Sequence, residues 1–406
     1  MQRLLPSELL FSILACSFLC SCSNAPRQAC PPGELVAFFS NPSASQFDAL
    51  ASCLPDTAAY NKEFRSCRDT APLGTVRTVL ADSAGLPFHL GYVTPKTLTT
   101  GAAYPLVIYL HGGIGTERID KGDSAFLMLE PLADSLDLFL ASPSANHDAP
   151  WWTPSGLSRI LQTLRYMTLR YPVDLDRIFL AGVSDGATGC YAAANTIPGP
   201  FAGFIAVSGF GGMLPALGMP LLPANLMQRP IYNVNAGGDH LYPVGQVKQF
   251  ITALQEQGVA VTDKWYMDEK HGFDYRDKEM GALAGLLRTW KQPASGAIAW
   301  IFVPGFPNLP ANLLDWTLAP DDNAFVQAYW RGDTLMVRSK GVQSFTMAMR
   351  SATIKGDKIA CRFLDGRKQF KRFPRIKNAW PEQLRLLESG CFPEFFPSSF
   401  YRISIP

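Results

Sequence analysis

Ser184 lies in the segment Gly182-Val183-Ser184-Asp185-Gly186, with a glycine two positions away on either side. The mostly apolar run 177–181 precedes it and the alanine-rich run 187–194 follows it, which predicts a strand before the serine and a helix after it. A serine hydroxyl is a weak nucleophile unless a sharp turn exposes it within reach of a base. The glycines permit such a turn, and the helix N-terminus stabilises developing negative charge. We therefore expect Ser184 to be a nucleophile.

The five-residue motif is weak evidence by itself. With 33 glycines in 406 residues, roughly one chain in five of this composition would contain such a segment by chance. The motif gains weight only if the other groups that a serine nucleophile needs are present. In hydrolases built on open α/β sheets, a glycine-containing loop precedes the serine, and an acid and then a histidine follow it.

Elimination leaves His271 as the general base. The chain has five histidines, of which three precede the serine: His89, His111 and His147. His240 directly follows Asp239, so the two side chains would diverge. His271 follows the last expected strand of the sheet, on a loop that could reach the serine. The alternative is a structural histidine.

Asp239 is expected to be the acid that orients this histidine. It lies between the expected strand 231–235 and the expected helix 243–257, where the orienting carboxylate belongs. The alternative is a carboxylate that caps the following helix. Asp268 is a weaker candidate because it lies on the wrong side of the last strand for the usual order.

Two further groups of residues belong to the expected site. Gly112 and Gly113 follow the apolar run 105–110, so a backbone N–H of this loop and that of Asp185 could bind an oxyanion. The alternative for the loop is a flexible turn. Trp151 and Trp152 precede a helix near the same edge of the sheet and could either stack on a substrate or pack a loop against the core.

Strands and helices alternate through the middle of the chain. Strands are expected at 75–81, 87–94, 105–110, 136–141, 177–183, 201–208, 231–235 and 259–267, and helices at 154–171, 187–194 and 243–257. Alternation of this kind predicts an α/β fold with a mostly parallel sheet and helices on both faces.

The composition changes after about residue 293. Short strands are expected at 325–330, 334–337, 344–349, 359–363 and 400–405, which predicts a small β-rich C-terminal domain. The basic run 367–377 is either a solvated surface or a contact for anionic lipid or polysaccharide. We therefore divide the mature chain into an N-terminal segment, 23–70, a catalytic domain, 71–293, and a C-terminal domain, 294–406.

Three segments resemble a known group of enzymes: 85–95 (GLPFHLGYVTP), 104–113 (YPLVIYLHGG) and 182–187 (GVSDGA). They are similar to exported α/β hydrolases of the polyhydroxybutyrate depolymerase and feruloyl esterase group, and prolyl oligopeptidase-like peptidases carry similar cores. The resemblance covers about residues 75 to 290. It implies an α/β-hydrolase fold and a Ser-Asp-His triad that needs neither a metal nor an organic cofactor.

The first 22 residues predict export. A mostly apolar stretch from Leu9 to Leu19 is too short to span a bilayer and ends in small residues. Leu19-Cys20-Ser21-Cys22 resembles the lipobox of bacterial lipoproteins, which implies a lipid on Cys22 and a place in the bacterial cell envelope, at the outer membrane. The alternative is an ordinary cleaved signal and a periplasmic or secreted protein.

Export affects the expected state of the cysteines, because disulfides persist in oxidising compartments. Cys361 is expected to pair with Cys391, and two of Cys30, Cys53 and Cys67 to pair in the N-terminal segment. Cys190, on the helix after the serine, is expected to be a buried free thiol.

The net charge of +2 is too small to indicate nucleic acid as a partner. No Cys-x-x-Cys pair is present, so a zinc site is not expected. The leading hypothesis is an exported serine esterase acting on carboxylic esters, including esters linked to a polysaccharide or polyester. The alternatives are a serine peptidase with the same triad and a catalytically silent lipoprotein that binds glycans.

Overall fold

The computed structural model of the protein describes residues 71–115, 120–125, 129–292, 298–311, 313–321, 323–349, 357–365, 369–377 and 399–406. The expected signal, the lipidation site at Cys22 and the N-terminal cysteines lie outside these residues. No helix within the described part of the chain is long and apolar enough to cross a membrane.

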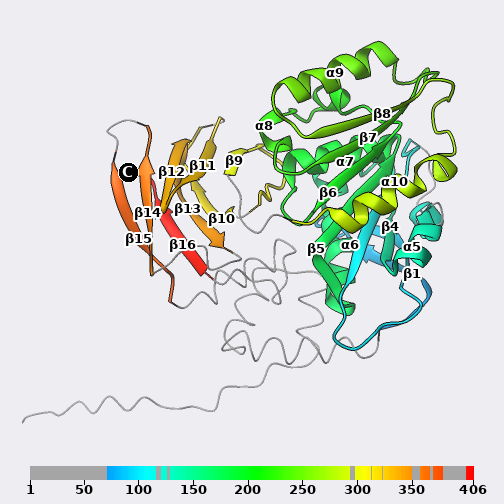
Figure 1. The fold of residues 1–406 in the computed structure, drawn as a ribbon, viewed down its shortest axis with the longest axis horizontal. Helices are drawn as coiled ribbons and strands as arrows, with labels where there is room; N and C mark the ends of the chain where they lie inside the picture. Colours follow the sequence, from blue (N-terminus) through cyan, green and yellow to red (C-terminus); the bar gives the residue numbers. More distant parts are fainter. Residues whose placement is uncertain are drawn as a thin grey trace, which may run out of the picture.

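An eight-stranded sheet forms the centre of the larger unit (Figure 1). Its strands are β1 (Thr75–Ala81), β2 (Pro87–Val93), β3 (Tyr104–Leu110), β4 (Phe139–Pro143), β5 (Val173–Val183), β6 (Gly203–Val207), β7 (Ile231–Ala236) and β8 (Val261–Tyr266). They lie in the order β1-β2-β4-β3-β5-β6-β7-β8. The first two strands are antiparallel, and pairing from β4 through β8 is parallel. The expected mostly parallel sheet is confirmed.

Helices cover both faces of this sheet, as expected. One face packs against α6 (Pro154–Arg170), α7 (Asp185–Thr196) and α9 (Val244–Glu256). The other packs against α5 (Glu130–Leu136) and α10 (Arg276–Thr289). Thr153 begins α6 by accepting a hydrogen bond from the Gly156 amide at 3.2 Å. Three short helices complete this unit: α4 (Gly122–Ala125), η2 (Gly211–Leu217) and α8 (Pro223–Leu226).

One expected strand begins later than the sequence indicated. The expectation was 136–141, but α5 continues to Leu136, and Asp137 then adopts a left-handed conformation with φ of 47°. This conformation ends the helix, as is common at C-termini. The chain enters β4 only at Phe139.

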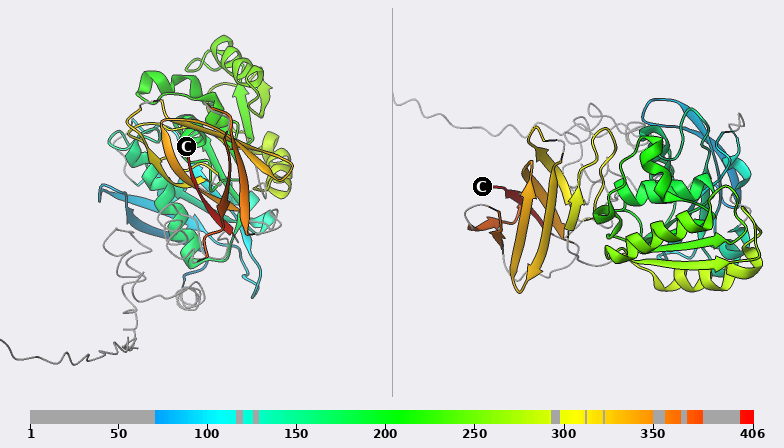
Figure 2. Two further views of the ribbon diagram at one scale, coloured as in Figure 1. Left: turned by 90° about the vertical axis from the view of Figure 1, so that its left-hand side faces the viewer. Right: turned by 90° about the horizontal axis from the view of Figure 1, so that it is seen from above.

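The C-terminal unit consists of two smaller sheets, which confirms the expected β-rich domain. One holds β10 (Leu313–Leu318), β13 (Val342–Met349) and β16 (Ser399–Ser404). The other has the order β15-β14-β12-β11-β9, from β9 (Ile298–Ile301), β11 (Phe325–Arg331), β12 (Thr334–Lys340), β14 (Lys358–Phe363) and β15 (Phe370–Pro374). Residues from both sheets form one hydrophobic core. Figure 2 shows these strands beside the larger unit.

The cysteines inside the described residues are both free thiols. Cys190 is fully buried on α7, as expected. Cys361 was expected to pair with Cys391, but it is free and 0% exposed in β14. Its side chain belongs to the core of the C-terminal unit, so this expected disulfide is wrong in the structure. Burial raises the pKa of the Cys361 thiol to about 12, which leaves it protonated.

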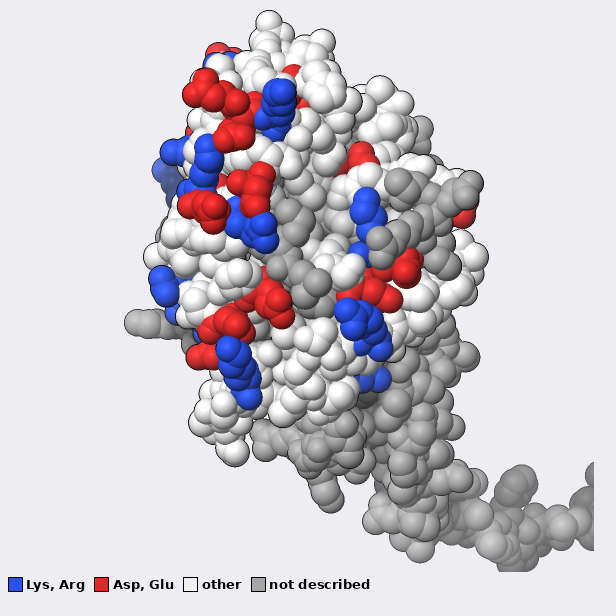
Figure 3. Space-filling model, turned by 90° about the vertical axis from the view of Figure 1, so that its right-hand side faces the viewer, with Lys and Arg blue, Asp and Glu red and all other residues white. Residues whose placement is uncertain are grey.

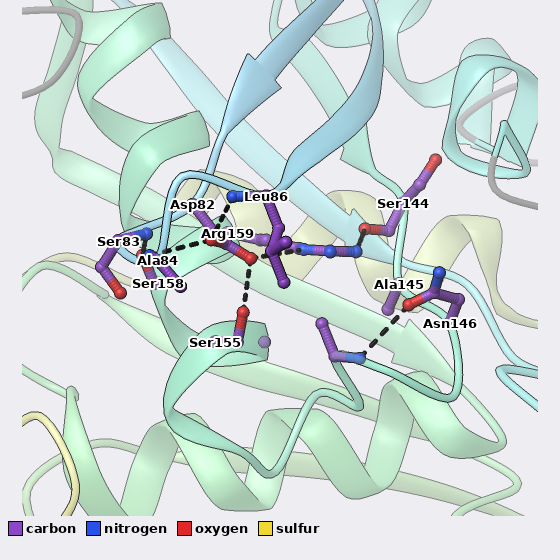
Figure 4. A network of polar contacts seen from close by, with 12 residues as sticks. Asp82, Ser83, Ala84, Leu86, Ser144, Ala145, Asn146, Ser155, Ser158 and Arg159 are labelled. Atoms are coloured by element: carbon purple, nitrogen blue, oxygen red, sulfur yellow. Dashed lines mark hydrogen bonds and ion pairs between the residues drawn. The ribbon is translucent and has the colours of Figure 1, made fainter.

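A buried ion pair holds the β1–β2 hairpin against α6 (Figure 4). The Asp82 carboxylate accepts backbone hydrogen bonds from Ala84 and Leu86 and a hydroxyl hydrogen bond from Ser155. Its cation is Arg159, with Nε 3.4 Å from the carboxylate and a second bond to the Ser144 carbonyl. Both charged side chains are almost fully buried. This network ties two elements that are far apart in the sequence.

Candidate active site

Ser184 lies on the turn between β5 and α7, at the centre of the sheet. Its φ of 56° and ψ of −118° are costly for a residue with a side chain. The flanking glycines are required by close approach: a Cβ on Gly182 would lie 2.3 Å from the Gly186 carbonyl oxygen, and one on Gly186 would lie 2.0 Å from that of Leu110. The strained turn therefore presents the serine hydroxyl at the carboxyl end of β5.

The structure brings His271 and Asp239 to this hydroxyl. Ser184 Oγ lies 2.9 Å from His271 Nε2, and His271 Nδ1 lies 2.8 Å from Asp239 Oδ2. A carboxylate can only accept, so the ring proton is on Nδ1 and the lone pair of Nε2 faces the serine. The His271 and Asp239 side chains are 14% and 4% exposed, which limits competition from water. These three residues have the arrangement of a nucleophile, a base and an orienting acid.

The second oxygen of the Asp239 carboxylate is also occupied. Oδ1 accepts the backbone N–H groups of Leu241 and Tyr242 at 2.9 and 3.0 Å. The carboxylate is therefore fixed in position with one oxygen on the backbone and the other on His271.

The loop after β3 lies directly against the serine. A Cβ on Gly112 would lie 2.9 Å from Ser184 Cβ, so only glycine allows this approach. Lys121 Nζ donates to the Gly112 carbonyl at 2.6 Å. The Asp185 carboxylate accepts the N–H of Ile114 at 2.9 Å, which anchors the loop to the first turn of α7. This carboxylate contact was not expected, because the sequence indicates a role only for the Asp185 backbone N–H.

The two tryptophans differ in position. Trp151 was a candidate for stacking on a substrate, but it is 0% exposed and part of the core. Its indole Nε1 donates to the His111 carbonyl at 3.0 Å, and its ring packs against the His111 ring at 5.4 Å. Trp151 therefore packs against His111, at the start of the glycine loop, and is too deeply buried to stack on a ligand. Trp152 is half-buried against the same core, and its contact with a substrate stays a prediction.

Tyr242 is a neighbour of the triad that was not predicted from the sequence to belong to the site. Its ring packs edge-on against the His271 ring with centroids 5.4 Å apart. Burial raises the pKa of its phenol and the Asp185 charge adds to this rise, while the nearby hydroxyls of Thr188 and Ser184 oppose it. The phenol is consequently neutral at ordinary pH. Its position three residues after Asp239 was the available signal.

The loops that carry the acid and the base also expose apolar side chains. Leu241 and Met267 are each 56% exposed; Leu241 lies two residues after Asp239, and Met267 four before His271. Exposed apolar groups beside such a site suit the uncharged parts of a substrate. Within the described residues no cluster of three or more His, Cys, Asp or Glu side chains could hold a metal ion.

Residues 151–294 match the dienelactone hydrolase family. This range includes Ser184, Asp239 and His271 but begins after the glycine loop at 112–113. A search of curated proteins finds no match. The family match supports hydrolase chemistry, and together with the sheet order and the serine turn it identifies the fold of the larger unit as that of the α/β hydrolases.

Solved structures with a similar fold include both esterases and peptidases. A thermostable esterase is 21% identical with a TM-score of 0.42, and the match covers 53% of this chain and 60% of that chain. A fluorophosphonate-binding serine hydrolase of Staphylococcus aureus is 18% identical with a TM-score of 0.44, covering 53% and 99%. An acylaminoacyl peptidase of Pyrococcus horikoshii is 14% identical with a TM-score of 0.44, covering 59% and 44%. The chain thus spans less than two thirds of that esterase and of that peptidase, and similarities at this level carry no argument about the reaction.

Proposed function

We propose that the protein is a serine hydrolase that cleaves carboxylic esters through an acyl intermediate on Ser184. The observation that carries this proposal is the pair of hydrogen-bonding contacts that joins Ser184 Oγ to His271 and His271 to Asp239, at 2.9 and 2.8 Å. Esters are favoured over peptides because the matched family is named for the hydrolysis of a lactone, which is a cyclic ester.

In the first step Ser184 Oγ attacks the carbonyl carbon while His271 Nε2 takes the hydroxyl proton. The imidazolium that forms is stabilised by Asp239 through Nδ1. The tetrahedral intermediate then collapses, its bond to the leaving oxygen breaks, and His271 returns the proton to that oxygen. Alcohol departs and an acyl ester on Ser184 remains. Water activated by His271 repeats the sequence and releases the carboxylic acid.

The negative charge on the carbonyl oxygen needs two backbone donors. Asp185 is the first residue of α7, so its N–H has no partner within the helix. We assign the oxyanion site to the amide of Asp185 and to an amide of the 112–113 loop, which the absence of a Cβ on Gly112 allows to lie directly against Ser184.

Labelling with a fluorophosphonate and hydrolysis of p-nitrophenyl acetate test this proposal. We expect Ser184→Ala to abolish labelling and to lower turnover by about 10⁴-fold or more, and Asp239→Asn to lower kcat by about 10⁴-fold while the fold is retained. Ser135→Ala is the matched control, because Ser135 is an exposed serine on α5. Labelling that persists in Ser184→Ala would contradict the proposal.

Assays on the wild-type protein also distinguish the esterase from the two alternative functions. A panel of acyl esters and matched amides decides between esterase and peptidase, and faster cleavage of the amides would favour the peptidase. A wild-type protein that neither labels nor turns over any substrate, yet binds polysaccharide, would favour a silent binding protein.

For the location, we propose export and attachment to the bacterial cell envelope through a lipid on Cys22. The apolar stretch and the lipobox-like sequence before Cys22 support this. Growth with an alkyne fatty acid should label the wild-type protein and not Cys22→Ser. Equal labelling of the two proteins would exclude Cys22 as the anchor.

A further inference from the structure

The register of the five-stranded C-terminal sheet defines which side chains share its outer surface. Inward-facing residues such as Val326, Val337 and Cys361 are buried in the core of this unit. Because side chains alternate along a strand, the residues between them face outward. The outward residues that carry charge are Arg331, Arg338, Lys340, Lys358, Arg362 and Arg372. We call this surface the cationic face.

The cationic face carries no carboxylate from its own strands. Arg338 pairs with Asp365 and Lys340 with Asp321, both from loops. Asp333 lies in the β11–β12 turn at the end of the face. The remaining four cations are exposed and have no ion pair within the described residues: Arg331, Lys358, Arg362 and Arg372. The face therefore has an uncompensated positive charge.

A row of large side chains crosses the middle of this face. Tyr329 lies opposite Met336, Met336 beside Arg362, and Arg362 opposite Phe370. Tyr329 and Phe370 are 41% and 51% exposed, while Met336 between them is buried. With about 4.8 Å between strands, the row spans about 14 Å. Its length suits several units of a polymer better than a single small molecule.

We propose that the cationic face binds an anionic polysaccharide, a polymer of uronic acids. Guanidinium groups match carboxylates in a bidentate geometry, and exposed aromatic rings pack against the apolar face of a sugar ring. The row holds both kinds of group, with Arg362 directly beside Phe370 and Tyr329 at the other end, so one polymer chain can contact them together. The proposal does not depend on the activity of Ser184.

Other reasons for basic residues on a sheet explain less of the pattern. Charged side chains protect an exposed edge strand from pairing with another strand, which explains the cations of β15. Edge protection does not explain the cations of β11, β12 and β14, which are inner strands. A membrane site would need a continuous apolar surface, whereas the exposed rings of Tyr329 and Phe370 are separated by the recessed Met336 and the charged Arg362. At the opposite end of the molecule, Lys and Arg lie interspersed with Asp and Glu (Figure 3), in contrast to the cationic face.

Binding of the full chain to sodium polygalacturonate, measured by affinity gel electrophoresis at low salt, tests the proposal. We expect retention of the wild-type protein, at least a tenfold weaker affinity for Arg362→Glu/Arg372→Glu, and an about two- to tenfold weaker one for Tyr329→Ala/Phe370→Ala. Neutral dextran should not retain the protein, and added salt should weaken binding. Lys371→Glu is the matched control, since Lys371 is exposed on the same strand but lies opposite the inward-facing Cys361.

Hydrolysis of p-nitrophenyl acetate and the thermal unfolding midpoint show whether each variant is folded. The proposal is overturned if polygalacturonate does not retain the wild-type protein or if Lys371→Glu weakens binding as much as the double variant does. It is also overturned if single-stranded DNA or phosphatidylglycerol vesicles bind more tightly than polygalacturonate, because the face would then serve a different polymer or a membrane.

Discussion

Tyr242 contributes to the site through its backbone and its ring separately. Its N–H donates to Asp239, which any residue at this position except proline would do. Its ring packs against the imidazole of His271 and so restricts the orientation of the base. The hydroxyl lies near the hydroxyls of Ser184 and Thr188.

The ring and the hydroxyl can be separated by substitution. We expect Tyr242→Phe to hydrolyse p-nitrophenyl acetate at nearly the wild-type rate, because the ring contact is kept. Tyr242→Ala should lower kcat/KM by roughly two- to tenfold, since an aromatic pair contributes about 0.5–1.5 kcal/mol. Steady-state kinetics check both. An equal loss in the two variants would show that the hydroxyl, and not the ring, carries the effect.

At the scale of elements, the sequence predicted those segments whose own pattern determines them. Strand β3 is a continuous apolar run, the second half of β5 is mostly apolar, and the Ser184 turn needs glycines at fixed positions. Helix α10 was not anticipated, because Gly281 and Gly285 weaken the local preference for a helix. Its stability comes from burial of Leu283 and Leu287 on the sheet, which is tertiary packing that a local pattern does not contain.

For the site too, the sequence predicted the residues but not how tertiary packing places all of them. The chain order indicated Ser184, Asp239 and His271, and the structure places them in contact. The burial of Trp151 could not be predicted, because a tryptophan before a helix is equally suited to a pocket or to a core. Its position depends on the His111 carbonyl, 40 residues earlier in the chain.

The ion pair between Asp82 and Arg159 gives a prediction at the element scale. Burial lowers the pKa of the Arg159 guanidinium, and the charge of Asp82 opposes this shift. Arg159→Met would leave the Asp82 carboxylate buried without its cation, so we expect a loss of about 3–5 kcal/mol in the free energy of unfolding. Urea denaturation measures it.

Two variants serve as controls for this prediction. Arg177→Met removes a partly exposed ion pair with Asp174 and should cost at most about 1 kcal/mol. The double variant Asp82→Asn/Arg159→Met should recover part of the loss, because no unpaired charge remains buried. A single Arg159→Met variant as stable as Arg177→Met would show that the pair does not hold the hairpin.

At the scale of the whole molecule, side-chain amides join the two units. The Asn225 side chain on α8 donates to the Ile301 carbonyl and accepts the Ile301 N–H, at 2.9 and 2.8 Å. Gln228 donates to the Ala299 carbonyl at 3.2 Å and accepts the Ala311 N–H at 2.8 Å. Three of these four bonds are to backbone groups of β9, the edge strand of the five-stranded sheet. An open edge is thereby converted into a specific contact with the hydrolase unit.

Asn225 is 0% exposed, so Asn225→Ala should leave the buried carbonyl of Asn195 and the partly buried backbone groups of Ile301 without this partner. Each unsatisfied group costs about 1–3 kcal/mol, and we expect the free energy of unfolding to fall by at least about 2 kcal/mol. The lost contacts join the two units, so we expect the two units to unfold in two separate transitions, measured by calorimetry, where the wild-type protein shows one. Asn323→Ala is the control, because Asn323 is an exposed asparagine in a loop of the C-terminal unit. If both variants unfold at the same temperature in a single transition, the junction is held by other contacts.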